Sequence, residues 1–396
     1  MVTIKEAVTR RELVRFMEFP NRLYRGNPHY VPDMLDSQVK DMQRDKNPAF
    51  EYCEAKCFLA LRGRRIVGRI ACIMNRRANE KFGKQYMNIS HIDFIDDDEV
   101  VDALFDAAEA YARQMGCTAV HGPLGFSDMD REGMLVDGFD RRSLFFTNYN
   151  APYYPEHLTR LGYRKDVDWI EYRIAVPEPG GMEAERLHKL SQYILKRKNL
   201  HVATLHHKSE YGPYVRQVFE LINAAYAPLY GVVELSDAQI ERYAKKFIPL
   251  VDPEFVCFVL DEQENLVAFG VTTLDPSVAL KHSDGRLFPF GWAGVLNDLH
   301  HGDTLIMLLT AVRPDLQTEG INAVMMDHVC QSCNRHGVQF AETGPMLEKN
   351  DHILAQWKRL DKEQHKRRRC FIKDLDHDVN AANAAAAAAE EAECAQ

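Results

Sequence analysis

A segment that joins an apolar run to a helical pattern offers the clearest chemistry in this sequence. The run 304–312 is followed by Pro314 and then by a turn made of Gln317, Thr318, Glu319, Gly320, Ile321, Asn322 and Ala323. The first N–H groups of a helix have no intrahelical partner, and the helix dipole adds partial positive charge there. Gly320 lets a ligand approach the backbone without meeting a Cβ. Because several successive amides would point at one ligand, the segment predicts a diphosphate site rather than a carboxylate site.

A plainer interpretation of the same segment stays open. Gly320 also permits a tight turn between a strand and a helix, and a helix N-terminus does not always bind an anion. Glu319 counts against a phosphate site because it puts negative charge beside the expected ligand, unless its side chain points to solvent.

Candidate acid–base residues lie on both sides of this segment. Glu342 stands near the end of the next expected strand, and a short polar stretch before residue 304 holds Asp298, His300, His301 and Asp303. Carboxylates and histidines can transfer protons near neutral pH. Exposed carboxylates and ordinary turn chemistry are the alternatives, so their role depends on where the fold places them.

One cysteine pair has the spacing of a half zinc site. Cys330 and Cys333 form a CxxC pair, with His328 and His336 nearby. Structural zinc sites of this type usually combine two such pairs. Because all four residues fall on one expected helix and no second CxxC pair exists, we expect no metal.

The elements that must position these residues occur twice along the chain. Strand-like runs lie at 56–61, 65–75 and 85–95, followed by a helical pattern at 99–116, a strand ending in Gly122-Pro123, a second helix, and a run at 168–174. The same order returns as runs at 254–260, 265–274 and 304–312, the helix from Gln317, a strand at 338–345 ending in Gly344-Pro345, a helix at 351–360, and a run at 367–375. Repeated order of this kind indicates an internal duplication.

The boundary between the two copies is a cluster of Pro and Gly within residues 175–185. Such a cluster interrupts both helix and strand. We therefore expect a first domain over residues 1–175, a linker over 176–185, and a second domain over 186–376. Each is expected to be of the α/β class with an open mixed (α+β) sheet. Residues 377–396 form an Ala-rich, low-complexity tail to which we assign no function.

Composition excludes several classes of protein. The chain has 396 residues, a net charge of −9, 46% hydrophobic and 27% charged residues, and nine scattered cysteines. Nonspecific nucleic-acid binding depends on an excess of Lys and Arg, which this chain lacks. The first residues contain no apolar core of a signal peptide, and no apolar stretch reaches membrane-spanning length. We expect a cytoplasmic protein that binds no nucleic acid.

The segment 317–322 resembles the phosphate-binding signature of the GNAT superfamily of acyl-CoA N-acyltransferases, Gln/Arg-x-x-Gly-x-Gly/Ala, with Asn322 at its last position. Both halves are similar to this family in element order, so the resemblance implies two tandem GNAT-like domains. It implies that acyl-CoA is the co-substrate and that its pyrophosphate binds at residues 317–323. It further implies that the pantetheine arm meets the strand end at Ala311, Val312 and Arg313, with Asn350 beside the thiol.

The first half departs from this pattern at the corresponding place. It has Asp96, Asp97, Asp98 and Glu99 at the start of its helix. These acids complement the helix dipole, but they would repel a pyrophosphate. We therefore expect the first domain to be a degenerate copy that supports the second or lines the acceptor site.

Acyl transfer to an amine needs a neutral amine, a stabilised oxyanion, and a proton for the leaving thiolate. The resemblance makes Glu342 the first candidate for the base, with His301 and Asp298 as alternatives. It places the oxyanion contact on a backbone N–H near residues 310–312. The tyrosine that the family uses as an acid falls on Trp357, seven residues after Asn350. A replacement from the first half would come from Tyr149, Tyr153 or Tyr154.

The sequence therefore predicts an N-acyltransferase that moves an acyl group from coenzyme A to a primary amine. The acceptor stays open between a small molecule and a lipid. A sphingoid-base N-acyltransferase, similar to a ceramide synthase, is one alternative, because the aromatic stretches 141–149 and 285–292 would suit long chains. The same stretches would equally suit a core or an interface. A noncatalytic acyl-CoA-binding or scaffold protein is another, and an aminoacyl-tRNA-dependent transferase is disfavoured by the negative charge. A basic run at 358–369 would contact either the ribose phosphate of the coenzyme or an anionic membrane surface. The plainer interpretation is a solvent-exposed helix or strand face.

Overall fold

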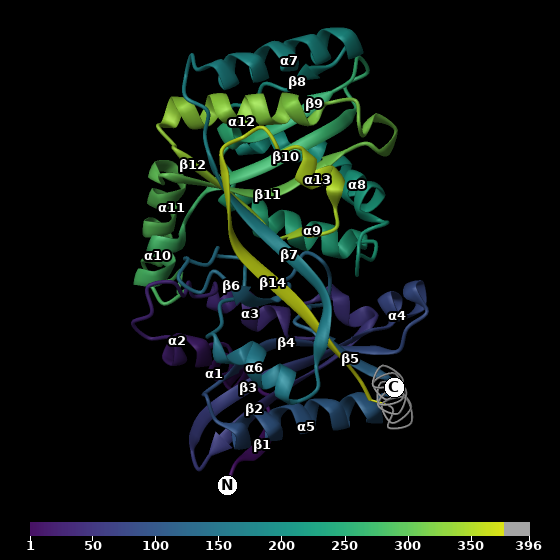
Figure 1. Ribbon diagram of the computed structural model, residues 1–396, viewed down its shortest axis with the longest axis vertical. Helices are drawn as coiled ribbons and strands as arrows, with labels where there is room; N and C mark the ends of the chain where they lie inside the picture. Colours follow the sequence, from purple (N-terminus) through teal and green to yellow (C-terminus); the bar gives the residue numbers. More distant parts are fainter. Residues whose placement is uncertain (376–396) are drawn as a thin grey trace, which may run out of the picture.

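The computed structural model describes residues 1–375, and its two halves follow each other along the long axis of the molecule (Figure 1). The expected Ala-rich tail, residues 377–396, lies outside the described residues.

The first half opens with a short strand and three helices that precede the repeated elements. These are β1 (Thr3–Glu6), α1 (Arg10–Met17), α2 (Phe19–Leu23) and α3 (Leu35–Asp41). The repeated elements follow as β2 (Cys53–Arg62), β3 (Arg65–Asn75), α4 (Arg76–Phe82), β4 (Tyr86–Phe94), α5 (Asp98–Gln114), β5 (Ala119–Gly122), β6 (Met134–Asp137), α6 (Tyr153–Arg160) and β7 (Arg164–Ala175).

The second half begins with α7 (Met182–Lys198), β8 (His201–Val202), α8 (Gly212–Tyr226) and α9 (Asp237–Phe247). Its remaining elements are β9 (Val256–Leu260), β10 (Leu266–Leu274), α10 (Ser277–His282), α11 (Gly291–His301), β11 (Thr304–Val312), α12 (Asn322–His336), β12 (Phe340–Thr343), β13 (Met346–Leu347), α13 (Asp351–Ala355) and β14 (Lys362–Asp374). Short 3-10 turns are η1 (Pro48–Glu51), η2 (Lys208–Tyr211), η3 (Ile248–Leu250), η4 (Pro253–Phe255) and η5 (Pro314–Leu316).

The repeated order expected from the sequence is present. The series β2, β3, β4, α5, β5, α6, β7 returns as β9, β10, β11, α12, β12, α13, β14. In each half the strand before the long helix pairs in parallel with the strand after it, β4 with β5 and β11 with β12. The expected linker is shorter than 176–185, because α7 already begins at Met182. Glu183 and Glu185 lie in its first turn, where acids favour a helix.

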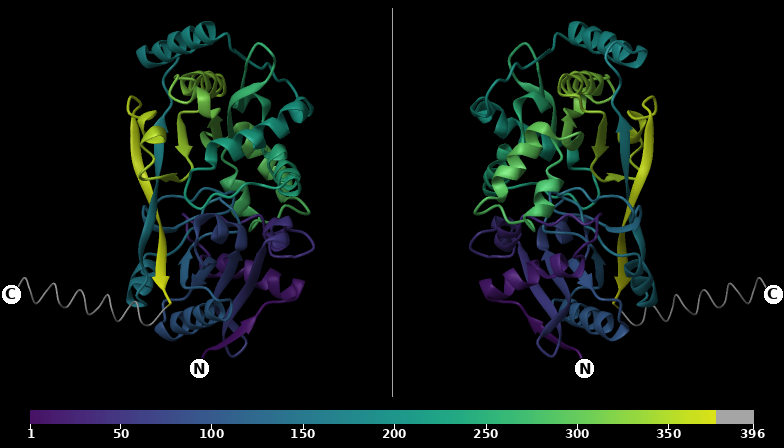
Figure 2. Two further views of the ribbon diagram at one scale, coloured as in Figure 1. Left: turned by 90° about the vertical axis from the view of Figure 1, so that its right-hand side faces the viewer. Right: turned by 90° about the vertical axis from the view of Figure 1, so that its left-hand side faces the viewer.

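The strands form one sheet, and here the expectation of a separate sheet in each half is wrong. The sheet runs in the order β1-β2-β3-β4-β5-β14-β7-β12-β11-β10-β9-β8. The last strand of each half has crossed over: β7 pairs with β12 of the second half, and β14 pairs with β5 of the first. Both long strands run side by side across the two halves, as Figures 1 and 2 show.

The exchanged strands carry buried charges where they meet. The side chains of Lys366, Arg368 and Glu171 are fully buried, and Lys366 Nζ lies 3.2 Å from both Glu171 Oε2 and Glu342 Oε2. Burial would raise the pKa of Glu171, but Arg368 and Lys366 lower it to about 2. The basic run 358–369 is therefore not a solvent-exposed face throughout, because Lys366 and Arg368 are buried and paired inside the sheet.

Helices cover the sheet and complete the cores. The long helix α5 packs on β2 and β3, while α8 packs on β10 and β11 and α12 lies between β9 and α7. The apolar side of α5 is buried through Val100, Val101, Leu104, Phe105 and Ala108. Within residues 1–375, no helix combines the length and apolar character that crossing a membrane requires.

Candidate active site

The turn between β11 and α12 leaves backbone donors free. Strand β11 ends at Val312, and after η5 the helix begins at Asn322 without a side-chain cap. Within the described chain, the N–H groups of Thr318, Gly320, Ile321 and Asn322 form no hydrogen bond. Four free donors beside a helix N-terminus attract an anion with several oxygens.

The backbone of this turn keeps those donors accessible. Thr318 has φ 71° and Gly320 has φ 83°. A Cβ at Gly320 would stand 3.1 Å from Ile194 Cδ1 of α7. Glu319 turns away, since its Oε2 lies 2.7 Å from Lys198 Nζ and this ion pair lowers the pKa of its carboxyl. The acid that counted against a phosphate site is therefore paired outside it.

Next to the turn, the sheet opens. Strand β11 pairs with β12 only over Thr304–Met307, and its pairing with β10 shifts register between Val271 and Thr272. Residues 308–312 consequently border a cavity of about 990 Å³. All predicted cofactor-binding residues line this cavity except Glu319 and Arg313. The Arg313 guanidinium donates two hydrogen bonds to the Asp315 carboxylate, from Nε at 2.8 Å and from Nη2 at 3.1 Å.

Three carboxyl groups from the first half line the opposite wall. Asp128, Asp130 and Glu132 lie between β5 and β6 and face the same cavity. Burial raises the pKa of Asp128 to about 6. Burial also raises the pKa of Glu132 well above its usual range, and the neighbouring carboxylates of Asp128 and Asp130 raise it further. Asp130 accepts hydrogen bonds from the N–H groups of Phe126 and Ser127. Asp128, whose pKa of about 6 leaves it ionised at neutral pH, favours a cation in the cavity.

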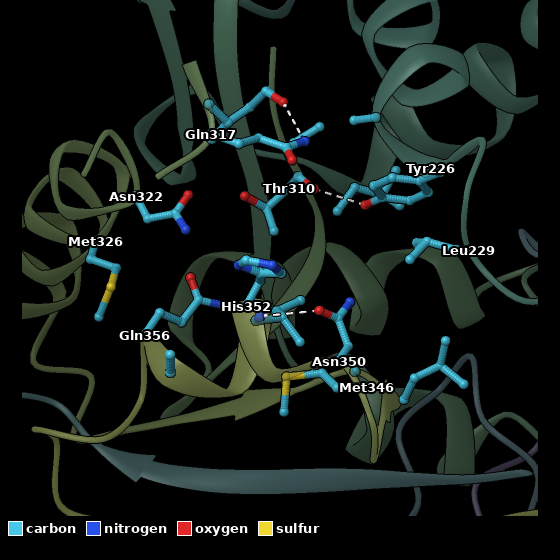
Figure 3. Close-up of a pocket in the computed structure, with 18 of the residues that line it drawn as sticks. Tyr226, Leu229, Thr310, Gln317, Asn322, Met326, Met346, Asn350, His352 and Gln356 are labelled. Atoms are coloured by element: carbon cyan, nitrogen blue, oxygen red, sulfur yellow. Dashed lines mark hydrogen bonds between the residues drawn. The ribbon is translucent and has the colours of Figure 1, made fainter. Parts of the chain in front are cut away.

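Two further residues reach into the cavity from the second half. The Tyr226 hydroxyl, at the end of α8, donates to the Thr310 carbonyl at 2.8 Å, and burial raises its pKa to about 12. Figure 3 shows His352 of α13 pointing into the same space, opposite Gln317 and Thr310. Sequence reasoning missed Asp128, Glu132 and Tyr226, because their segments match no motif and only the fold brings them to one cavity. It also missed His352, although this residue lies two positions after Asn350.

Known proteins resemble this chain in sequence and in fold. No family model matches the chain. Protein YghO of Escherichia coli (strain K12) is 25% identical over 382 residues, which cover 94% of this chain and 95% of that protein. A bacterial ceramide synthase of Caulobacter vibrioides is 29% identical over 295 residues, which cover 73% and 74%. A solved tandem GNAT protein from the clavulanic acid biosynthesis pathway superposes with a TM-score of 0.53 at 13% identity, covering 95% of this chain and 99% of that one.

The chain has a tandem GNAT fold. The α/β class and the tandem arrangement predicted from the sequence are thereby confirmed. At 13% identity the likeness establishes the fold alone, so the chemistry has to be argued from the residues in the cavity.

Within the GNAT fold, the three predicted catalytic residues lie away from the cavity. Glu342 on β12 faces Lys366, with His365 Nε2 at 3.7 Å, and is part of the buried ion cluster. Asp298 on α11 accepts a hydrogen bond at 2.8 Å from the N–H of Ala279 in α10. His301 ends the same helix and is exposed. None of the three lines the cavity.

The residues expected around the thiol divide in a similar way. Asn350 lines the cavity and caps α13 by accepting the N–H of Ile353. Trp357, at the position of the GNAT tyrosine, is buried and directs its indole N–H to Met346 Sδ at 3.2 Å. The tyrosines proposed as replacements, Tyr149, Tyr153 and Tyr154, pack in the core of the first half and do not reach the cavity.

The corresponding helix end in the first GNAT half is closed by its own acids. The Asp97 side chain accepts the N–H of Val100, and Arg62 binds both Asp97 and Glu99. Asp96 and Asp98 face His157. A pyrophosphate would meet negative charge here, as the sequence indicated.

The remaining predicted features lie at varied places. Cys330 and Cys333 are buried on α12, and Cys330 Sγ lies 3.7 Å from the Pro177 carbonyl. Lys358 and Arg359 line the cavity. Of the aromatic stretches, 141–149 contributes Phe146 to the cavity. No residue of the stretch 285–292 lines the cavity, and the Phe288 side chain in it is 73% exposed.

Proposed function

We propose that the protein is an acyl-CoA-dependent N-acyltransferase whose donor binds in the second half. The observation that carries the proposal is the meeting of two features in one cavity. Free N–H groups at residues 318–322 suit a pyrophosphate, and the strand edge at residues 308–312 lies open beside them. An extended pantetheine arm can bind along such an edge by main-chain hydrogen bonds.

In this proposal the donor extends from the turn at residues 317–323 toward the wall formed by Asp128, Asp130 and Glu132, which we call the acid wall. Its pyrophosphate binds the four free N–H groups, and exposed cations at the cavity rim, Arg186, Lys358 and Arg359, meet its remaining phosphate charge. The pantetheine arm follows β11 from Val312 toward Leu308. The thioester then stands between Tyr226 on one side and the carboxyl groups of the first half on the other.

Asp128 is the proposed base in place of Glu342. Its pKa of about 6 leaves it ionised at neutral pH yet basic enough to take a proton from a bound ammonium group, directly or through water. The neutral amine then attacks the thioester carbonyl, forming the C–N bond. A backbone N–H of β11 stabilises the oxyanion. As the C–S bond breaks, the thiolate receives a proton from the hydroxyl of Tyr226, which its raised pKa keeps protonated until that step. The nitrogen loses its surplus proton as the amide forms, and this proton returns to Tyr226 through water.

A long-chain amino alcohol of the sphingoid type is the second candidate for the acceptor. The relative that is 29% identical over 73% of this chain is named a bacterial ceramide synthase. The cavity has apolar walls from α7, from the segment after α8 and from the end of α9, which suit an alkyl chain. Their side chains are Leu187, Leu190, Leu229 and Phe247. The amino group of such a molecule would lie at the acid wall and its chain along these side chains.

Coenzyme A binding tests the donor assignment. In titration calorimetry, Gly320→Asp should abolish binding because it adds bulk and negative charge among the free N–H groups. Gly337→Asp is the matched control, because Gly337 also has a positive φ, ends the same helix and faces open space. Equal affinity of the two variants would overturn the donor site.

A further inference from the structure

A second polar cluster lies where three neighbouring strands meet, apart from the donor site. His121 is on β5, Cys370 on β14 and Asp166 on β7, and β14 runs between the other two strands. One ligand atom from each residue lies within 4.8 Å of the others. Tyr230, in the segment after α8, donates its hydroxyl to Asp166 Oδ2 and lies 3.8 Å from Cys370 Sγ.

The tautomer of His121 follows from its other ring nitrogen. Nε2 faces the Asn88 Oδ1 atom, which can only accept, so Nε2 carries the proton. Nδ1 therefore presents a lone pair. This atom is fully buried and has no hydrogen-bond partner within the described chain. A buried acceptor without a partner is costly, and a metal ion is one ligand that satisfies it.

The donor set matches one class of metal ion. Imidazole nitrogen, cysteine sulfur and carboxylate oxygen are the ligands of tetrahedral zinc, whereas calcium and magnesium prefer oxygen alone. The hydrogen bond from His121 to Asn88 is the kind of outer contact that orients a metal-bound histidine. Within residues 1–375, the Asp166 carboxylate accepts a hydrogen bond from Tyr230 and has no ion-pair partner, so a divalent ion would supply positive charge beside it.

We propose that His121 Nδ1, Asp166 and Cys370 Sγ bind a zinc-type divalent ion. The Tyr230 hydroxyl or a water molecule completes the fourth position. The ion ties the exchanged strand β14 to strands of the first half, and through Tyr230 it reaches the cavity wall, which Tyr230 also lines. Its role is structural: it fastens the two halves at the edge of the cavity. The proposal is independent of the acyltransferase assignment.

Metal binding by the full chain, free of any affinity tag, tests this site. Elemental analysis of protein purified without chelator should find about one zinc per chain. After chelation, Co²⁺ titration should restore one equivalent with a sulfur-to-cobalt charge-transfer band, and zinc should raise Tm by several degrees. Absence of zinc together with absence of the cobalt band would overturn the proposal.

Two variants locate the ion. Cys370→Ser should lose the charge-transfer band, and His121→Gln should lower the affinity for Co²⁺ by about 10- to 100-fold or more. Cys117→Ser is the matched control, since Cys117 is also a buried cysteine but lies in the first half, outside the cluster. Circular dichroism checks that each variant is folded. A cobalt band that persists in folded Cys370→Ser would place the metal at another site, such as Cys330 and Cys333, and would overturn the proposal.

Discussion

At the scale of single residues, the proposed proton transfer rests on Asp128. Its carboxyl must be ionised to accept a proton, and its pKa is raised to about 6 by burial. We therefore expect kcat/KM to fall as the pH is lowered through about 6. Asp128→Asn should reduce turnover by about 10² to 10⁴ and remove that acidic limb. Steady-state rates between pH 5 and 9 measure both effects.

Glu342→Gln discriminates between the two candidate bases. Glu342 is held by Lys366 away from the cavity, so its loss should leave the pH profile in place. If Glu342→Gln removes the acidic limb while Asp128→Asn keeps it, the base is Glu342 and the geometry of the cavity has been misjudged.

Tyr226 is the residue expected to protonate the thiolate. Tyr226→Phe should keep coenzyme A binding and lower kcat by about 10², because the leaving group departs without its proton. Tyr214→Phe on the same helix removes a hydroxyl that does not line the cavity, and it should be close to the parent. Single-turnover kinetics with a saturating acyl-CoA distinguish the two. Equal rates in both variants would remove Tyr226 from the mechanism.

The sequence allowed the placement of residues within one local unit to be predicted, but not the placement of residues that depends on distant segments. The residues 317–323 belong to one strand–turn–helix unit, so their pattern alone indicated free amides. Glu342 was chosen for its place near a strand end, but it faces Lys366 in a buried cluster that also needs Glu171 of β7, from the first half of the chain. Asp128 and Tyr226 are more than 90 positions apart, and no local pattern relates them.

At the scale of elements, the exchanged strands β7 and β14 depend on their buried ion cluster. Glu171→Gln would leave Arg368 and Lys366 with less negative charge inside the sheet. Breaking a buried pair in this way costs about 3–5 kcal/mol. Urea unfolding should show a loss of this order.

The same strand offers a control for this loss. Glu363 of β14 pairs with Arg141 where both side chains are exposed. Exposed pairs contribute about 0–1 kcal/mol, so Glu363→Gln should change the unfolding free energy little. A similar small loss in both variants would mean that the buried cluster does not hold the strands together.

The repeated order of elements was predictable because strand and helix patterns are local. The crossing of β7 and β14 was not, since each strand would also fit the sheet of its own half. Their buried charges carry the information, because Glu171 meets its partners only when β7 and β14 are neighbours.

At the scale of the whole molecule, one sheet joins both halves. We expect a single cooperative unfolding transition, because separating the halves would break the pairing of β7 with β12 and of β14 with β5. Fragments 1–175 and 182–396 should fold poorly alone and regain a native spectrum when expressed together. Two well-separated calorimetric transitions would show instead that each half is an independent domain.

The halves also divide the proposed chemistry. The second supplies free amides and an open strand, whereas the first closes its own helix end and contributes carboxyl groups to the shared cavity. In the proposed function, the two copies are no longer equivalent: the second provides the donor side and the first the acceptor side.

A crystal structure with bound coenzyme A tests this division most directly. The account predicts pyrophosphate oxygens about 2.7–3.2 Å from the N–H groups of Gly320, Ile321 and Asn322. The pantetheine arm should follow β11, and the thiol should lie between Tyr226 and Asp128. Coenzyme A bound at the start of α5, or anywhere outside this cavity, would contradict the account.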